Sequence, residues 1–479
     1  MKVALVLCPR WDPEFPLASL ALLSAQLKSR GHEVEILDIN HMITMLDSLD
    51  QKWPESHTGM SNVGASEDFV REVFPRYRGW LETLSKRILA NGCRLVGFSI
   101  YYSNLPMSLE FAKILKKLDP DVKIVFGGPS CLVFSDCLKY IHEEGVDAVI
   151  FGEGDISLPR LVDDFESSGR LHAGPGILLK GEERTWKEYQ ETPENLNELP
   201  HADYSGFAML DSYAGKMIHT TRGCVRKCVF CLDWREMRFR RMSGRRIFEE
   251  FSHQLACHPK MTSFVFGDSI LNSSLPDLAE LCRLLVSHGA KASWGSFAIV
   301  RPDMTENLLA KMRDAGCRWL SYGVESGAAQ LLGEMNKGVP PARNAEILRR
   351  TAQAGIKTIA TWMVGFPSET EQLFEESIAF LRANAKNIGS LRCSLFSIRT
   401  MQEMAERFDL KPEQDEMFWA TKDGANTFPV RLNRMRRTLE AARDEGIDAN
   451  CWGISSVADW ENYERTLMRQ YEAHMAAAC

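Results

Sequence analysis

Hydrophobic and polar positions alternate regularly over the first third of the chain. Short runs rich in β-branched residues recur between longer stretches whose apolar residues have helical spacing and end in Gly or Asp-Pro. This alternation is typical of parallel strands joined by crossover helices. The pattern therefore predicts a doubly wound, Rossmann-like α/β domain over residues 1–165. Its five predicted strands are residues 2–7, 33–37, 94–100, 122–128 and 147–153.

A stretch rich in Gly, Pro, Glu and Asn then interrupts the alternation and predicts a linker over residues 166–210, with room for a small hairpin. A second α/β series follows. Its predicted strands are residues 216–221, 263–268, 292–298, 319–324, 357–364 and 390–398. Six repeats predict a partial (β/α)6 barrel over residues 211–400, with ligands at the C-terminal ends of its strands. Residues 401–479 have helical spacing and predict a small helical C-terminal region.

The composition is that of an ordinary globular protein. Of the 479 residues, 45% are hydrophobic and 25% are charged, and no apolar stretch reaches the roughly 18 residues of a membrane span. The apolar run at the N-terminus is too short for a signal-peptide core. The 13 cysteines are scattered without the dense spacing of a disulfide scaffold, which favours a reducing compartment. We therefore expect a cytoplasmic protein with no membrane partner.

Three cysteines lie close together in TTRGCVRKCVFCLDW, residues 220–234. They are Cys224, Cys228 and Cys231, and they follow the first strand of the second series, where a barrel binds its ligands. Three interpretations are open. The thiols could be ordinary buried residues, although the flanking charges argue against a core position. They could bind zinc, with His219 as a fourth ligand. They could also hold an iron-sulfur cluster, in which three thiolates instead of the usual four leave one iron open.

The C-x3-C-x2-C spacing, on the loop after the first strand of a six-repeat β/α barrel, resembles that of the radical S-adenosylmethionine (SAM) superfamily. The resemblance implies a 4Fe-4S cluster held by Cys224, Cys228 and Cys231, with SAM chelating the open iron. It places Phe230 near the adenine. It also implies an external electron donor of the flavodoxin or ferredoxin type.

Other strand ends carry the same resemblance. Asp268 in FVFGDSIL, and Glu325 and Ser326 in SYGVESG, stand where relatives contact SAM. MVGFPSET, residues 363–370, is similar to the family's Gly-Phe-Pro-Gly-Glu-Thr turn, with Ser368 in place of Gly. Taken singly, an acid at a strand end is often a helix N-cap and Gly-Phe-Pro is often a turn.

The first domain adds paired glycines in VFGGPS, at the end of its fourth strand, where the backbone can approach a bulky ligand closely. No G-x-G-x-x-G follows the first strand, which disfavours a nicotinamide site. Placed before a radical SAM barrel, residues 97–155 closely resemble the cobalamin-binding domain of B12-dependent radical SAM enzymes. The cobalamin contacts that this resemblance implies are Ser99, Gly127 and Gly128 along the nucleotide tail, Tyr102, Asn104 and Leu105 below the corrin ring, and Glu153 at the rim.

One part of the wider cobalamin-binding pattern is missing. The Asp-x-His-x-x-Gly motif, whose His coordinates cobalt from below, is replaced by CPRWDPEF after the first strand. Many radical SAM relatives also lack this motif and bind cobalamin without that His ligand. The sequence therefore favours cobalamin without a His from this motif.

Nucleic-acid binding is disfavoured by the net charge of −7. The basic run at residues 226–246 could form an RNA patch, but it also suits a solvated face or the neutralisation of a negative cluster and the SAM carboxylate.

The two resemblances together imply a cobalamin-dependent radical SAM methyltransferase that acts on an unactivated carbon, or on phosphorus, of a small molecule or natural-product intermediate. A non-methylating relative that performs ring rearrangement, cyclisation or transfer of another part of SAM is the enzymatic alternative. This alternative stays open because Arg399 and Thr400 stand where relatives have a Pro-Gly-Thr-Pro-Leu turn. Arg399 could bind an acidic substrate or form a surface ion pair. A non-catalytic iron-sulfur or zinc sensor is the alternative from another class.

Overall fold

The computed structural model describes residues 1–9, 11, 12, 14–50, 71, 73–182, 191–398, 401–411, 416–451 and 457–477. Contacts divide the described residues into two compact units. The first unit comprises the described residues up to Thr221, together with Arg240–Gly267. The second comprises Arg222–Phe239 and the described residues from Asp268 onward. Arg399 and Thr400, which the sequence singled out, lie outside the described residues.

The first unit is built on a six-stranded sheet in the order β2-β1-β3-β4-β5-β6. The strands are β1 (Lys2–Leu7), β2 (Glu33–Asp38), β3 (Cys93–Ser99), β4 (Lys123–Gly127), β5 (Ala148–Ile150) and β6 (Ile177–Leu179). The first five are parallel to their neighbours, and β6 is antiparallel to β5. The strand order reverses between β1 and β3. The C-terminal ends of these two strands are therefore the switch point at which a doubly wound sheet binds its ligands.

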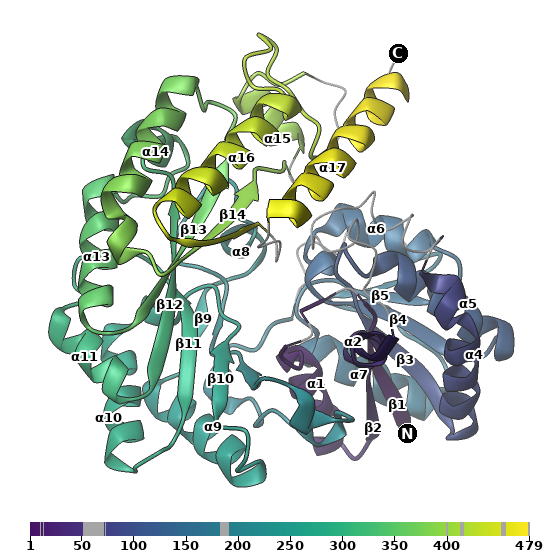
Figure 1. The fold of residues 1–479 in the computed structure, drawn as a ribbon. Coiled ribbons are helices and arrows are strands. Elements are labelled where there is room, and N and C mark those ends of the chain that lie inside the picture. The colour runs from purple at the N-terminus through teal and green to yellow at the C-terminus, as the bar shows by residue number, and fades with distance from the viewer. Residues whose placement is uncertain are drawn as a thin grey trace. The chain divides into compact units, whose positions relative to one another are not determined.

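Helices cover both faces of this sheet (Figure 1). They are α1 (Ala18–Ser29), α2 (Ile39–Asp50), α4 (Phe74–Ala90), α5 (Leu105–Leu118), α6 (Phe134–His142) and α7 (Gly154–Ser168). Successive side chains of a strand point to opposite faces. Val3, Leu5 and Leu7 of β1 accordingly join a core with α1 and α7. Ala4 and Val6 join a second core with α4, α5 and α6. Burial on both faces explains why β1 is apolar without interruption after Lys2.

The first unit also contains the beginning of the second α/β series. Strands β7 (Lys216–Ile218) and β10 (Ser263–Phe266) pair in parallel. Between them lies α9 (Gly244–Cys257). The side chain of Ser243, directly before this helix, accepts a hydrogen bond from the Arg246 amide and caps it. Two short strands, β8 (Thr221–Arg222) and β9 (Arg240–Arg241), form a small sheet.

The second unit continues the series with parallel strands in the order β15-β14-β13-β12-β11. The strands are β11 (Ser293–Ala298), β12 (Cys317–Glu325), β13 (Lys357–Val364), β14 (Ser390–Leu395) and β15 (Asp448–Cys451). The helices are α8 (Asp233–Glu236), α10 (Leu275–Ser287), α11 (Glu306–Asp314), α12 (Ala329–Glu334), α13 (Pro341–Gln353), α14 (Glu371–Asn384), α15 (Met401–Arg407), α16 (Phe428–Asp444) and α17 (Val457–Ala477). Ser274, Thr305 and Thr370 cap α10, α11 and α14 by accepting a backbone hydrogen bond.

All eleven predicted strands are present, with ends that shift by a few residues, and the parallel α/β fold class is confirmed. Four strands are additional among the described residues. The short strands β8 and β9 pair with each other. Strand β6 lies within the stretch that the sequence assigned to a linker. Strand β15 lies within the region predicted to be helical, where α15, α16 and α17 are indeed helices.

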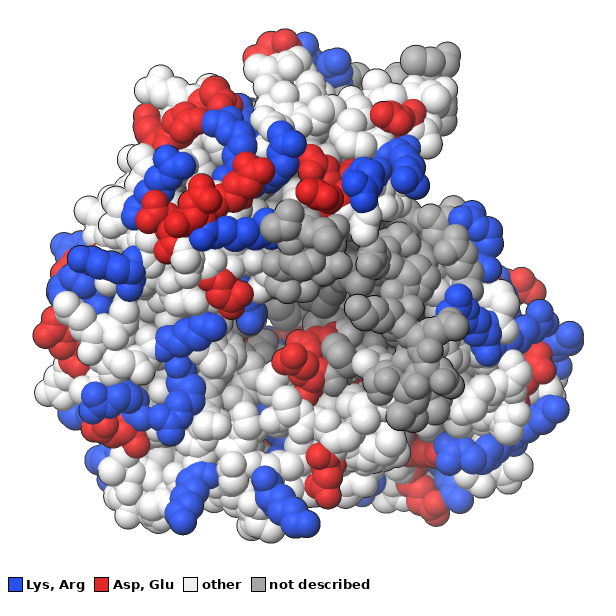
Figure 2. Space-filling view, in the orientation of Figure 1, with Lys and Arg blue, Asp and Glu red and all other residues white. Residues whose placement is uncertain are grey.

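The described surface is mixed in charge. On the face seen in Figure 2, Lys and Arg side chains are interspersed with Asp and Glu. Among the described helices, none is both long enough and apolar enough to cross a membrane.

Candidate functional site

The three neighbouring cysteines lie on a loop, residues 222–239, that we call the cysteine loop. Thr220 and Met242 flank this loop, and the Met242 amide donates a 2.8 Å hydrogen bond to the Thr220 carbonyl. Gly223 has a φ of +69°, and a Cβ added there would lie 2.6 Å from the Met237 carbonyl oxygen. Glycine is therefore required where the chain enters the loop. The Arg-Gly that precedes the first cysteine is thus a structural part of the motif.

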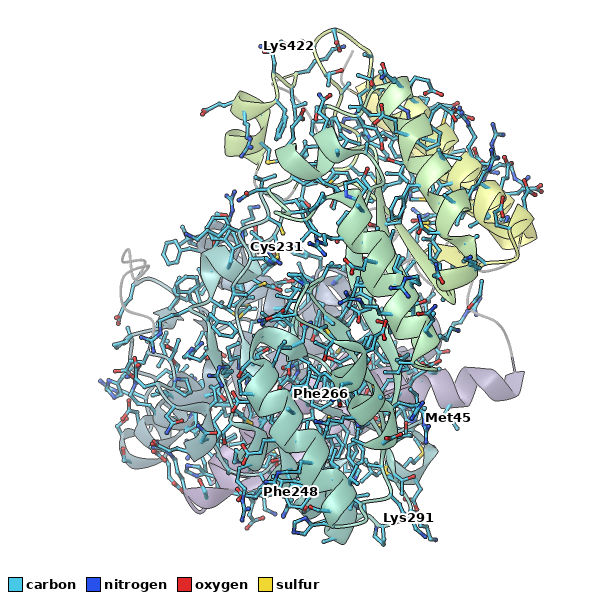
Figure 3. The ribbon with its side chains drawn as sticks, turned by 90° about the vertical axis from the view of Figure 1, so that its left-hand side faces the viewer. Met45, Cys231, Phe248, Phe266, Lys291 and Lys422 are labelled. Atoms are coloured by element: carbon cyan, nitrogen blue, oxygen red, sulfur yellow. The ribbon has the colours of Figure 1, made fainter. Side chains whose placement is uncertain are left out.

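Hydrogen bonds within the cysteine loop fix its backbone around the thiols. The Arg226 amide lies 3.4 Å from the Cys224 Sγ. The Cys228 carbonyl accepts hydrogen bonds from the Cys231 amide (3.2 Å) and from the Trp234 Nε1 (2.7 Å). None of the three thiols is in a disulfide. Cys228 is buried and the other two are half-buried, and Cys231 is labelled in Figure 3.

Burial raises the pKa of all three thiols. The pKa of Cys231 rises to about 12, with the Asp233 carboxylate as the next cause. The positive charge of Lys337 lowers the pKa of Cys224 and Cys228 and so offsets part of the effect of burial. The thiols of the metal-free chain are therefore protonated at neutral pH, and binding a metal centre must release protons.

The donor set fits a cluster better than a single ion. In the part of the chain that the structure describes, no group of three or more His, Cys, Asp or Glu side chains converges closely enough to hold one metal ion. The compact four-ligand zinc set that the sequence left open is therefore not assembled there. Thiolates that bind three different irons of a cubane stand farther apart than the ligands of one ion. Three thiolates on one loop are a donor set of the kind that holds a cubane cluster.

A charged assembly lies beside the cysteine loop. Glu325, at the end of β12, forms an ion pair of 3.3 Å with Lys337 and accepts a 3.2 Å hydrogen bond from the Thr361 hydroxyl. The Lys337 Nζ lies 5.9 Å from the centre of the Phe230 ring, in cation–π range. Glu325 has a φ of +64°, which is uncommon for a residue other than glycine. Backbone outliers of this kind concentrate at functional sites.

The chain after α12 contacts the cysteine loop with two successive residues before Lys337. The Met335 carbonyl accepts a 3.1 Å hydrogen bond from the Val229 amide, and the Asn336 side chain donates one of 2.7 Å to the Lys227 carbonyl. Sequence reasoning missed Lys337. The signal that could have found it is the Asn-Lys-Gly turn, in which Asn336 has a φ of +55°.

The four predicted SAM residues do not all lie together in the described contacts. The structure brings Phe230 and Glu325 together, through Lys337. The Ser326 hydroxyl instead contacts the Ser377 hydroxyl at 2.7 Å and accepts a hydrogen bond from the Ala328 amide. Its described contacts are therefore those of a turn. Asp268 is buried two residues after the end of β10.

The Gly-Phe-Pro turn after β13 has a clear structural role. The Gly365 amide donates to the Glu369 side chain at 2.8 Å, and Arg434 forms an ion pair with the same carboxylate at 3.4 Å. Gly365 has a φ of +84°, and a Cβ there would collide with the Arg431 side chain. Burial raises the pKa of Glu369 to about 7. The motif thus anchors α16 to the end of β13.

In the first unit, the predicted cobalamin residues gather at the C-terminal edge of the sheet. Ser99 is buried at the end of β3, which pairs with β4 through the Ser99–Gly127 register. Gly128 follows with a φ of +104°, and a Cβ there would lie 2.8 Å from the Ile100 amide nitrogen. No other residue fits this close approach of two strand ends.

Side chains of the loop after β3 contact both the loop's own backbone and neighbouring elements. Asn104 is fully buried, accepts a hydrogen bond from the Tyr101 amide and donates one to the Ser99 carbonyl, so it shapes the loop. Tyr102 donates a 2.5 Å hydrogen bond to Asp136, and Leu105 begins α5 half-buried. The ring of Tyr101 stacks on Trp11, from the loop after β1, with centres 3.9 Å apart. The sequence did not single out Trp11, which stands in the segment that replaces Asp-x-His-x-x-Gly.

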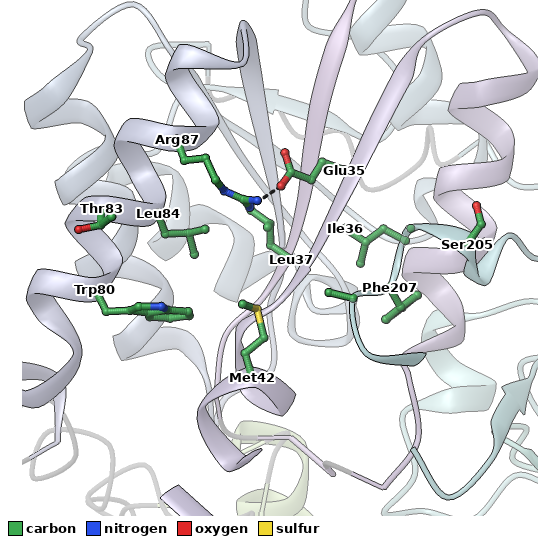
Figure 4. Close-up of a pocket in the computed structure, with 12 residues that line it drawn as sticks. Glu35, Ile36, Leu37, Met42, Trp80, Thr83, Leu84, Arg87, Ser205 and Phe207 are labelled. Carbon is green, nitrogen blue, oxygen red and sulfur yellow. Dashed lines mark hydrogen bonds and ion pairs between the residues drawn. The ribbon is translucent and has the colours of Figure 1, made fainter. Parts of the chain in front are cut away.

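Glu153, the predicted rim residue, forms a buried ion pair with Arg240. A separate pocket of about 440 Å³ lies beside β2 (Figure 4). Ile36, Met42 and Trp80 give it an apolar lining, and the Glu35–Arg87 ion pair lies at its side. None of the predicted site residues lines this pocket.

Comparison with known protein families gives two matches. The model of the radical SAM superfamily matches residues 218–381, and the model of the B12 binding domain matches residues 13–162. Both matches agree with the order of domains predicted from the sequence, so the predicted family and fold are confirmed.

Individual relatives are distant. An uncharacterized methyltransferase of Pyrococcus horikoshii is 26% identical over 60% of this chain and 64% of its own length. The anaerobic magnesium-protoporphyrin IX monomethyl ester cyclase of Rubrivivax gelatinosus is 24% identical over 66% of this chain and 56% of its own length. This chain therefore aligns with less than two thirds of either relative. The structure of the radical SAM methyltransferase TsrM from Kitasatospora setae, with cobalamin and a [4Fe-4S] cluster bound, aligns over 100% of both chains with a TM-score of 0.66 at 16% identity. This last similarity concerns the fold.

Proposed function

We propose, because the chain belongs to the radical SAM superfamily and carries an N-terminal B12-binding domain, that it is a cobalamin-dependent radical SAM methyltransferase. Its substrate class is a small molecule or natural-product intermediate that is methylated at an unactivated carbon or at phosphorus. When bound, the cluster supplies the electron that cleaves SAM, and cobalamin carries the methyl group.

The observation that carries the proposal is the cysteine loop itself. It presents three free thiols and no fourth within C-x3-C-x2-C. Phe230 lies within the loop, and Lys337 and Glu325 lie beside it. Cys224, Cys228 and Cys231 are the proposed cluster ligands. The carboxylate and ammonium of Glu325 and Lys337 are suited to the zwitterionic amino-acid end of SAM, and the Phe230 ring is suited to its adenine.

The edge of the first unit is the proposed cobalamin site. Ser99, Gly127 and Gly128 supply a hydroxyl and a backbone that a long nucleotide tail can approach closely. Tyr102 and Leu105 belong to the loop that would face the corrin ring. Asn104 supports that loop from within, and Glu153 holds Arg240 at the proposed rim.

A cytoplasmic location and an external one-electron donor of the flavodoxin or ferredoxin type complete the proposal. All the described cysteines are free thiols, which supports a reducing compartment.

A second candidate function is a radical SAM reaction without methyl transfer, such as cyclisation. The similarity to the Rubrivivax protein favours it, because that protein is a cyclase. Both candidates need SAM cleavage, and they differ in the product.

Anaerobic reconstitution with iron, sulfide and cobalamin tests the proposal. We expect a visible absorbance that bleaches on reduction, formation of 5′-deoxyadenosine from SAM, and a substrate mass that increases by one CH2 group. Cys228→Ala must abolish the first two signals, whereas Cys257→Ala, which removes an exposed cysteine outside the loop, must retain them. A cluster without 5′-deoxyadenosine would support a sensor. SAM cleavage without a mass gain on any tested substrate would favour the non-methylating candidate.

A further inference from the structure

We propose that Lys337 raises the reduction potential of the iron-sulfur cluster by holding a positive charge against the cysteine loop. This inference rests on the proposed function, because it presumes that the loop binds a 4Fe-4S cluster. Lys337 lies outside the cysteine motif, and the three thiolate ligands alone do not determine the potential of a cluster.

The position of Lys337 is determined by the residues immediately before it. Met335 and Asn336 are hydrogen-bonded to the backbone of the cysteine loop at Val229 and Lys227, which lie on either side of Cys228. The segment that leads into Lys337 is therefore attached to the cysteine loop on both sides of Cys228. The ion pair with Glu325 and the ring of Phe230 then hold the Lys337 ammonium in place.

Burial makes this charge effective. The side chain of Lys337 is only 15% exposed and that of Glu325 only 12%. Charges in such positions are screened by water and salt much less than surface charges are. The Gly323 position shows how tightly the pair is enclosed, since a Cβ there would lie 2.8 Å from both the Glu325 carboxylate and the Lys337 Nζ.

The ammonium, and not its counter-ion, contacts the cysteine loop. The Lys337 Nζ lies 5.9 Å from the centre of the Phe230 ring, which belongs to the loop. The described contacts of the Glu325 carboxylate are with Lys337 and with the Thr361 hydroxyl, both of which lie outside the loop. The Lys337–Glu325 pair therefore presents its positive end to the cysteine loop.

Net charge near a cluster is one of the factors that set its potential. Reduction adds one electron to a group already bound by three thiolates, so the reduced state is the more negative one. A fixed cation stabilises that state relative to the oxidised state. Lys337 should therefore ease electron transfer from the external donor, and Glu325 should oppose it.

The experiment is a potentiometric titration of the reconstituted full-length protein with dithionite and mediators, followed by electron paramagnetic resonance in the absence of SAM. For Lys337→Met we expect the equilibrium constant for reduction to fall roughly tenfold, which is about 59 mV for a one-electron couple. Lys337→Arg should keep the wild-type potential. Glu325→Gln should shift the potential in the opposite direction, and the double variant should lie between the two.

Lys227→Met is the matched control, because it removes a lysine of the same loop whose side chain is exposed and screened. A Lys337→Met potential equal to that of Lys227→Met would overturn the inference, as would shifts of the same sign for Lys337→Met and Glu325→Gln. If the Lys337→Met variant assembles no cluster, the Glu325→Gln variant tests the inference, because the sign of its shift in reduction potential is predicted. A wild-type protein that assembles no cluster would refute the proposed function instead.

Discussion

Arg240 and Glu153 form a bidentate ion pair in which each side chain is only 5% exposed. The Arg240 Nη1 donates to a Glu153 carboxylate oxygen at 3.1 Å and to the Pro193 carbonyl at 2.8 Å. Glu153 ends the turn before α7, and Arg240 begins the segment that follows the cysteine loop. Within the first unit, the pair therefore ties β9 to the turn before α7.

Breaking this pair should be costly, because one buried charge would be left without its partner. We expect Glu153→Gln to lower the free energy of unfolding by about 3–5 kcal/mol. The denaturant midpoint of the first unit, followed by circular dichroism, measures the loss. Glu191→Gln is the control, since its partner Arg160 lies in a more exposed pair, and it should cost at most about 1 kcal/mol. Equal midpoints for the two variants would contradict the prediction.

A methyl group at Gly128 should damage the proposed cobalamin site. The positive φ and the 2.8 Å approach to the Ile100 nitrogen leave no room for Gly128→Ala, so the strand ends must separate. We expect this variant to be purified with markedly less bound cobalamin, measured by its visible spectrum. Gly169→Ala has a similar φ of +70° with nothing within 4 Å. It should lose only about 1 kcal/mol and retain the cofactor; loss of cobalamin from both variants would argue against a local effect.

Glu369 predicts a pH dependence of stability. Its pKa is raised from 4.5 to about 7, chiefly by burial, so between these values the folded chain holds a proton that the unfolded chain has released. The contribution of Glu369 is therefore fully present below the lower value and is lost as the pH rises through 7. Over this range the wild type should lose up to about 3 kcal/mol relative to Glu369→Gln.

Thermal unfolding at several pH values measures this difference. Glu371→Gln should show the opposite pH dependence of stability relative to the wild type. Arg437 lowers the pKa of Glu371, so the Glu371 carboxylate stabilises the fold until the pH falls through its pKa. If Glu369→Gln follows the wild-type curve in parallel, the carboxyl does not titrate in this window.

The sequence predicted the parts of the fold that local patterns determine. The uninterrupted apolar run of β1 and the thiol spacing are of this kind. Strand β15 was missed because DANC contains no apolar run, and its extended conformation comes from pairing with β14. Strand β6 was missed because three residues in a Gly- and Pro-rich stretch carry little periodicity. Arg240 was missed because its partner Glu153 lies 87 positions away in the chain. Lys337 was missed because its contact with Phe230 joins two segments that are distant in the chain and that only the folded backbone brings together.

Asn336 offers a test of how the turn after α12 holds the cysteine loop. Its left-handed backbone favours Asn or Gly, and its side chain donates to the Lys227 carbonyl. Asn336→Gly keeps the backbone and removes the hydrogen bond, at a cost of about 1 kcal/mol, whereas Asn336→Ala adds strain of roughly 1 kcal/mol or more. We expect the reconstituted protein to release iron to a chelator faster in Asn336→Gly than in the wild type, and fastest in Asn336→Ala. Equal release from all three would mean that this contact does not stabilise the loop, whereas a change in Asn336→Ala alone would assign the effect to the backbone.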